Sequence, residues 1–193
     1  MRKVLFIAGL LLFTSGIARA SCARFEVGGG YAYTRVTSLG GFEGTTVAVK
    51  SVYSGGSSTT VNLNGWDAEA DYNLTCWLGI VANFSGVYAS PFGYSTHVYT
   101  ETFGPRVYFF GSGPIRPFVQ ALFGAGEAHC SYDGATCFSQ TAFAGNFGGG
   151  VQVSIGGPWA VEGDVGDVTT HFFNQYQNSL GIVAKVVFRF GGH

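Results

Sequence analysis

The sequence predicts an all-β fold, an eight-stranded antiparallel up-and-down β-barrel, on three observations. Alternating apolar and polar residues recur in runs of about ten, each ended by turn residues. The 193 residues include 31 glycines and 16% aromatics. Only 11% are charged, whereas a typical soluble domain has about 25%. The links between the runs are short and long in turn, which is typical of an up-and-down barrel.

The first twenty residues have the composition of an export signal. Basic Arg2 and Lys3 precede the apolar stretch Val4–Phe13, which is too short to span a bilayer as a helix. Ala18–Ala20 offers a small-x-small cleavage site. A retained membrane anchor and a lipoprotein are the alternatives, but Arg19 stands where a lipoprotein signal needs a large apolar residue. The predicted division is a cleaved Sec-type signal peptide, 1–20, and a barrel domain, 21–193.

Eight segments alternate in the manner of half-buried strands, each with bulky apolar residues on one face and small or charged residues on the other. In chain order these segments are Arg24–Val36, Val61–Tyr72, Trp77–Ala89, Val98–Phe110, Arg116–Ala128, Thr141–Ile155, Trp159–Thr169 and about Asn178–Phe190. The short links read NLTC, GSGPI and GGP. The other links are longer and form four predicted outward loops. An even number of strands places both chain ends on the short-link side.

The placement of charge predicts which face meets lipid. Soluble barrels are apolar inside and polar outside, whereas transmembrane barrels are the reverse. Here the charged faces are narrow and rich in glycine and alanine, as suits a tight lumen, while aromatics near the strand ends resemble an interfacial girdle. A soluble periplasmic ligand-binding barrel, the alternative, would expose these apolar faces to water. The residues expected in the lumen are Glu26, Asp67, Glu69, Asp71, Arg106, Glu162, Asp164, Lys185 and Arg189.

An unpaired charge in a low-dielectric lumen is costly, so these residues are expected to form an ion-pair network. Eight strands enclose only enough room for side chains. The sequence therefore favours a filled lumen over a conducting pore.

Four cysteines in an exported chain predict two disulfides, and sequence alone allows three ways of pairing them. Cys130 and Cys137 fall in one expected outward loop, whereas Cys22 and Cys76 fall at the opposite end. The pairs Cys130–Cys137 and Cys22–Cys76 are the connectivity that does not cross the height of the membrane. The pair Cys130–Cys137 is the better supported, and a free Cys22 in a frayed terminus is the alternative to Cys22–Cys76.

No residue pattern predicts catalysis, a cofactor or a metal. His97, His129 and His171 lie in or beside expected outward loops, and Ser95 is near His97, but no convincing third member completes a triad. His129, Cys130 and Cys137 lack a fourth zinc ligand. The glycine clusters do not open a helix or precede Lys-Ser/Thr, as a phosphate loop requires. The net charge of −1 gives no support for nucleic-acid binding.

Several stretches carry a resemblance to a known family: NGWDAEADYNLTCWLGIVANFSGVY, FGPRVYF, RPFVQALFGAG, FGGGVQVSIGGPWAVEGDVGDV and QNSLGIVAKVVFRFGG. They resemble the outer-membrane β-barrel domain family of Gram-negative bacteria, the small OmpA-like or "porin family" proteins. The resemblance implies insertion by the barrel-assembly machinery, whose signal would be Phe188 and Phe190 on the last strand, here followed by three more residues.

The resemblance also implies a function class. We expect a non-enzymatic outer-membrane protein, a monomer surrounded by lipid and lipopolysaccharide, with a structural or surface-interaction role. The alternative is an enzyme at the rim that modifies lipid A. The stretch THFFNQ is similar to the His-x-Ser region of a lipid A deacylase, but Phe173 stands in the place of the serine.

Overall fold

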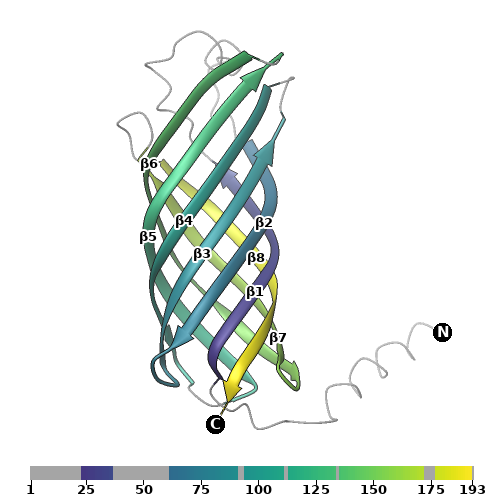
Figure 1. Cartoon of the computed structure of the whole chain (residues 1–193), viewed down its shortest axis with the longest axis vertical. Coiled ribbons are helices and arrows are strands. Elements are labelled where there is room, and N and C mark those ends of the chain that lie inside the picture. The colour runs from purple at the N-terminus through teal and green to yellow at the C-terminus, as the bar shows by residue number, and fades with distance from the viewer. Residues whose placement is uncertain are drawn as a thin grey trace, which may run out of the picture.

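The computed structural model describes residues 23–36, 61–90, 94–110, 113–133, 135–171 and 177–192. It confirms the predicted fold class: eight antiparallel strands form one closed barrel, in which each strand pairs with its neighbours in sequence and β1 pairs with β8 (Figure 1). The strands are β1 (Ala23–Val36), β2 (Val61–Asn73), β3 (Leu78–Ala89), β4 (Tyr94–Tyr108), β5 (Ile115–Tyr132), β6 (Ala135–Gly156), β7 (Trp159–Thr170) and β8 (Gln177–Gly192). The proposed signal peptide lies outside the described residues.

Alternation along each strand separates a lumen from an outer surface. On β8, the side chain of Lys185 is 4% exposed and that of its neighbour Val186 is 50% exposed. The same switch separates Asp67 from Trp66 on β2. Large apolar residues therefore cover the outside, and polar and charged residues fill the inside, which reverses the arrangement of a soluble barrel. No helix among the described residues is long and apolar enough to cross a membrane.

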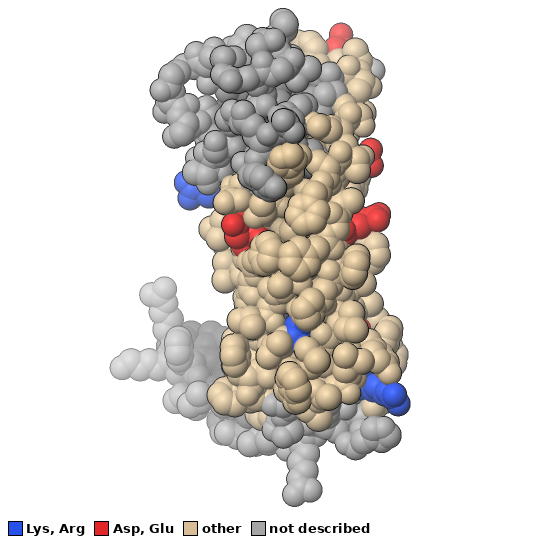
Figure 2. All heavy atoms as spheres, turned by 90° about the vertical axis from the view of Figure 1, so that its left-hand side faces the viewer, with Lys and Arg blue, Asp and Glu red and all other residues tan. Residues whose placement is uncertain are grey.

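Charge on the outer surface is sparse. On the side formed by β4, β5 and β6, most visible acidic atoms lie in the upper half, and the remaining described surface is nearly all uncharged (Figure 2). The short turns and the C-terminus lie at the lower end (Figure 1). Among the described residues, the exposed charged side chains are Arg24, Arg35, Glu101, Glu127, Asp133 and Asp167.

Aromatic side chains gather at two levels of the outer surface. In the upper level, Trp66 Nε1 donates a hydrogen bond to the Tyr88 hydroxyl at 2.9 Å. In the lower level, the Phe188 ring packs edge-on against Trp159 at 4.7 Å and Phe190 at 4.6 Å. Two such belts flank the apolar band of a transmembrane barrel, where amphipathic rings meet the headgroups. Phe188 and Phe190, the proposed assembly signal, thus belong to the lower belt.

The link between β5 and β6 differs from the prediction. The expected loop is instead a continuation of both strands, and β5 and β6 rise beyond their neighbours at the upper end (Figure 1). Asp133, with φ 47°, is in the turn that joins them. The dipeptide Asp133-Gly134 is a typical two-residue hairpin signal, because such turns need positive φ. The flanking residues are mostly polar, so their alternation alone did not reveal the two strands.

Candidate functional site: the lumen

Arg106 of β4 lies at the centre of the lumen and is 1% exposed. Its two terminal nitrogens donate to the two carboxylate oxygens of Glu69, both at 2.7 Å. The same guanidinium lies 3.3 Å from Glu162 and 3.7 Å from Asp71, and its Nε donates to Gln120 at 2.9 Å. This paired geometry uses the planar fork of arginine, which lysine cannot reproduce.

Lys185 of β8 extends its ammonium toward carboxylates of β2 and β7. Its Nζ is 2.7 Å from Glu69, 3.3 Å from Glu162, 3.3 Å from Asp164 and 3.4 Å from Asp67. One buried ammonium is therefore shared by four carboxylates. The strand register explains why Lys185 comes close to Asp67. Gly30 of β1 pairs with Asp67 of β2 on one side and with Lys185 of β8 on the other. A Cβ on Gly30 would overlap the carbonyl oxygen of Ala184, so the position requires glycine.

A second network fills the lower end of the lumen. Arg116 Nη1 donates to Glu26 Oε1 at 2.7 Å and to Gln152 Oε1 at 3.0 Å. Gln152 Nε2 donates to the other oxygen of Glu26 at 2.6 Å, and Asn73 Nδ2 to Glu26 Oε1 at 3.0 Å. Glu26 is thus held by partners from three other strands.

Aromatic rings separate the two arginines. The guanidinium of Arg116 lies 3.8 Å from the centre of the Tyr108 ring, and that of Arg106 lies 4.1 Å from the Phe118 ring. The two rings pack against each other at 5.8 Å, and the Tyr108 hydroxyl donates to Asp71 at 2.7 Å. Stacking of this kind adds cation–π attraction to the ion pairs.

The sequence-based picture of this lumen missed several residues. It expected small residues and charges only, whereas Tyr108, Phe118 and Leu122 are at most 2% exposed. Arg116 is also buried but was absent from the predicted network. The missed signal is alternation at the start of β5, where Arg116, Phe118 and Gln120 share one face.

The predicted lumen residues do not all meet. Arg106 and Lys185 approach five of the six carboxylates, and Arg116 approaches the sixth, Glu26. Arg189 is placed apart from these contacts, at the lower end of β8. Its Nη1 donates to Ser154 Oγ at 2.8 Å and its Nη2 to the Gly157 carbonyl at 3.4 Å. Arg189 therefore braces the turn between β6 and β7.

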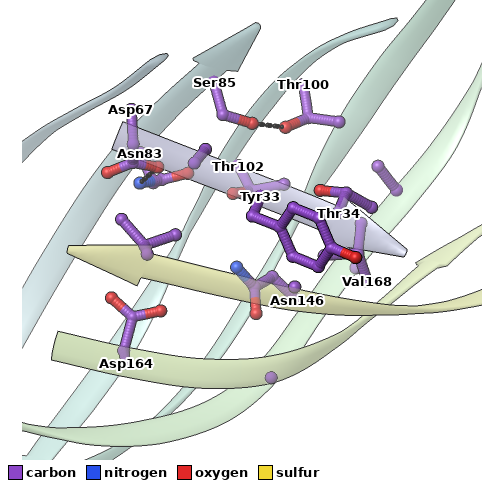
Figure 3. Close-up of a pocket in the computed structure, with 16 residues that line it drawn as sticks. Tyr33, Thr34, Asp67, Asn83, Ser85, Thr100, Thr102, Asn146, Asp164 and Val168 are labelled. Carbon is purple, nitrogen blue, oxygen red and sulfur yellow. Dashed lines mark hydrogen bonds between the residues drawn. The ribbon is translucent and has the colours of Figure 1, made fainter. Parts of the chain in front are cut away.

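Above Lys185 the lumen opens into a cavity with about 30 Å³ of space for water (Figure 3). Asp67 and Asp164 line it, and the rest of the wall consists in equal parts of hydroxyl or amide side chains and of glycine, alanine and valine. Asn83 Nδ2 donates to Asp67 at 2.8 Å, and Ser85 and Thr100 share a hydrogen bond of 2.6 Å. The filled part of the lumen is thus the lower part, and the upper part holds solvent-sized space.

Ser95 and His97 are neighbours at the rim. Ser95 Oγ and His97 Nε2 are 3.4 Å apart, which is long for a nucleophile–base hydrogen bond. The His97 ring packs edge-on against Tyr88 at 5.2 Å and His129 at 6.5 Å, and no described contact of His97 is with a carboxylate. Within the described ranges, no three or more His, Cys, Asp or Glu side chains are grouped to hold a metal ion.

Cys76 lies in the turn between β2 and β3 and Cys130 near the upper end of β5, and the two disulfides stay predictions. Cys130 is buried on β5, and β6 passes it with a shift of register at Cys137, so the two backbones are adjacent. No disulfide is formed between the described side chains. Cys22 and the side chain of Cys137 are outside the described part of the structure.

The predicted disulfide between Cys130 and Cys137 can be tested by alkylation before and after reduction. Barrel purified without reductant, unfolded and alkylated is expected to carry the label at neither cysteine, and at both after reduction. Peptide mapping by mass spectrometry measures this, and in a Cys130→Ser variant Cys137 is expected to label without reduction. Labelling of both cysteines in unreduced wild-type protein contradicts the pairing.

Solved structures with the same fold are outer-membrane barrels. Neisserial surface protein A, from Neisseria, superposes with a TM-score of 0.68 at 16% identity, over 87% of this chain and 98% of its own. Ail, the attachment invasion locus protein of Yersinia pestis, gives 0.56 at 17% identity, over 86% and 99%. The N-terminal barrel domain of Pseudomonas aeruginosa OprF gives 0.53 at 11% identity, over 86% and 98%. No family model matches the sequence, and no curated protein does. At these identities the likeness shows the fold alone.

Proposed function

We propose that this chain is a non-enzymatic protein of the outer membrane of a Gram-negative bacterium, whose barrel anchors a surface-exposed rim. One observation carries the proposal: buried charge lies inside the barrel, and exposed large apolar side chains lie outside it. A barrel with this inversion is stable only when lipid surrounds it. Neisserial surface protein A and Ail, by their names a surface protein and an attachment invasion locus protein, support a surface role.

The remaining parts of the proposal concern export and partners. The chain is exported through its cleaved signal peptide and inserted by the barrel-assembly machinery, with Phe188 and Phe190 as the recognition signal. It then lies as a monomer among lipid and lipopolysaccharide. The packing of Phe188 on Trp159 and of Phe190 on Phe188 supports this, because a terminal aromatic face on the last strand is what the machinery would meet.

The location has a direct test. Full-length chain expressed in a Gram-negative host is expected in the outer-membrane fraction, and unheated samples are expected to migrate differently from boiled ones on a detergent gel. Release by osmotic shock, with no difference between heated and unheated samples, would favour a soluble periplasmic barrel and overturn the proposal.

The lumen is proposed not to conduct ions. Arg106, Arg116, Tyr108 and Phe118 fill its lower cross-section with mutual contacts. We expect purified barrel in a planar bilayer to give no stable single-channel steps. A Tyr108→Ala, Phe118→Ala double variant removes the two rings and is the control for detecting an opened path. Regular conductance steps from the wild-type barrel would contradict a filled lumen.

A lipid A-modifying enzyme is the competing function. The long Ser95–His97 contact, without a described carboxylate partner, supports the non-enzymatic proposal. Mass spectrometry of lipid A from cells with and without the chain tests it. Unchanged acylation is the expected result, and a change lost in Ser95→Ala would make the rim an active site.

A further inference from the structure

The cavity above Lys185 has the features of an ion site. It holds about 30 Å³ of space for water, enough for about two water molecules. No cationic side chain lines the cavity, and the carboxylates of Asp67 and Asp164 do (Figure 3). Oxygen-bearing side chains that also line it include Asn83, Ser85, Thr100, Thr102 and Asn146.

Charge in the described lumen is unbalanced. Six buried carboxylates, Glu26, Asp67, Glu69, Asp71, Glu162 and Asp164, face three buried cations, Arg106, Arg116 and Lys185. Lys185 hydrogen-bonds to Glu69, and Arg106 makes its closest pair with the same residue. Asp67 and Asp164 are left with the longer contacts to Lys185, at 3.4 and 3.3 Å. The uncompensated negative charge is thus next to the cavity.

Unsatisfied oxygen atoms give an independent indication of a ligand. Thr102 is 5% exposed and lines the cavity, and its hydroxyl has no hydrogen-bond partner among the described residues. One oxygen of Asp67 and one of Asp164 accept no hydrogen bond there either, although each lies in an ion pair with Lys185 Nζ, at 3.4 and 3.3 Å. Buried polar atoms are nearly always satisfied by protein, water or an ion. The Thr102 hydroxyl therefore marks a place in the cavity for water or an ion, next to two carboxylates that share one ammonium with two others.

We propose that the cavity binds one monovalent alkali cation, sodium or potassium, together with water. A divalent cation is disfavoured, because the nearby ammonium of Lys185 would repel a double charge more strongly than a single one. A transition-metal site needs several histidine, cysteine or carboxylate ligands close together. Among the described residues, no three such side chains are grouped so that they could hold a metal ion. The positive charge of the ion compensates the carboxylates of Asp67 and Asp164. The Thr102 hydroxyl contacts the ion or one of its bound water molecules.

Rubidium tests the site directly, since it replaces potassium and scatters anomalously. Crystals of the barrel grown with rubidium chloride as the only alkali salt are expected to show an anomalous peak within the cavity, in contact with Asp67 and Asp164. Absence of the peak overturns the proposal. Displacement of the peak by an equal concentration of calcium also overturns it, because the site would then prefer a divalent ion.

Matched variants separate the ion from the fold. Asp164→Asn is expected to weaken binding about tenfold or more, because a charge-assisted contact becomes a neutral one. Asp71→Asn is the control: it removes a lumen carboxylate that lies outside the cavity lining, and the peak is expected to remain. Thr102→Val removes the hydroxyl and is expected to weaken binding, whereas Thr102→Ser keeps the hydroxyl and is expected to bind like the wild type.

A measurement in solution guards against variants that fail to fold. The unfolding temperature of wild-type barrel in detergent is expected to be higher in sodium chloride than in N-methylglucamine chloride of equal ionic strength. The difference is expected to vanish in Asp164→Asn and to persist in Asp71→Asn. Equal unfolding temperatures of the wild type in the two salts overturn the proposal. Membrane location and the gel shift do not depend on this ion, so they test the proposed function separately.

Discussion

Arg106→Met is expected to destabilise the barrel by about 3–5 kcal/mol, the cost of breaking a buried ion pair by removing one partner. The guanidinium holds both oxygens of Glu69 at 2.7 Å and approaches Glu162 at 3.3 Å. Without it, Lys185 is the remaining cation near these two carboxylates in the described lumen, and it is already shared with Asp67 and Asp164.

Urea titration of the refolded barrel in detergent micelles, followed by the gel shift between folded and unfolded forms, measures this effect. Arg106→Lys is expected to be intermediate, because it keeps a charge but loses the paired hydrogen bonds and the packing on Phe118 at 4.1 Å. Val119→Met, on the lipid side of the adjacent strand, is the control and is expected to stay within about 0.5 kcal/mol. A loss in Arg106→Met no larger than in the control contradicts a stabilising role of the network.

Val186→Arg is expected to cost about 2–4 kcal/mol, the penalty for a cation on the lipid face near the middle of the bilayer. Val186 is 50% exposed and lies on β8 between the two aromatic belts. Phe188 of the lower belt is two residues below it, and Tyr31 of the upper belt pairs with Ala184, two residues above it. Exchange of Lys185 and Val186 is expected to cost more, because it also strips four carboxylates of their shared cation.

The control for Val186→Arg lies on the same strand and the same face. Leu180 is 45% exposed and pairs with Arg35 and Asp167, so it is at the level where charge is already found outside. Leu180→Arg is expected to cost about 0–1 kcal/mol, as near an interface. Comparison of folding yields in lipid vesicles and of urea midpoints measures both. Equal losses at the two positions would mean that Val186 does not face lipid.

Most of the fold could be predicted from the sequence because large apolar residues on the outer face and small or charged residues on the inner face give strict alternation. For β1, β2, β3 and β7 the predicted ends lie within one residue of those observed. The signal fails where the outer face is no longer apolar. The upper parts of β4, β5 and β6 extend beyond the predicted strands, and their polar residues alternate little. The Asp133-Gly134 turn was the local signal there.

The lumen was less predictable, because pairing inside a barrel depends on register. Charge on one face of a strand predicts that a residue points inward, but not at which height it meets a partner. Arg189 points to the lower turn, whereas Arg116 reaches Glu26, 90 residues away in sequence. Tyr108 and Phe118 were missed for a related reason: large rings fit a narrow lumen where they stack on guanidinium groups.

The position of Lys185 on the last strand has a consequence for the order of assembly. Its four carboxylate partners come from β2 and β7, so a chain that has paired only its first seven strands holds them without this cation. Partly built intermediates are therefore electrostatically penalised, and arrival of β8 both joins the two sheet edges and brings the cation that these four carboxylates share. Folding is expected to be all-or-none, with the slow kinetic step at the meeting of β8 with β1, the strands farthest apart in the chain.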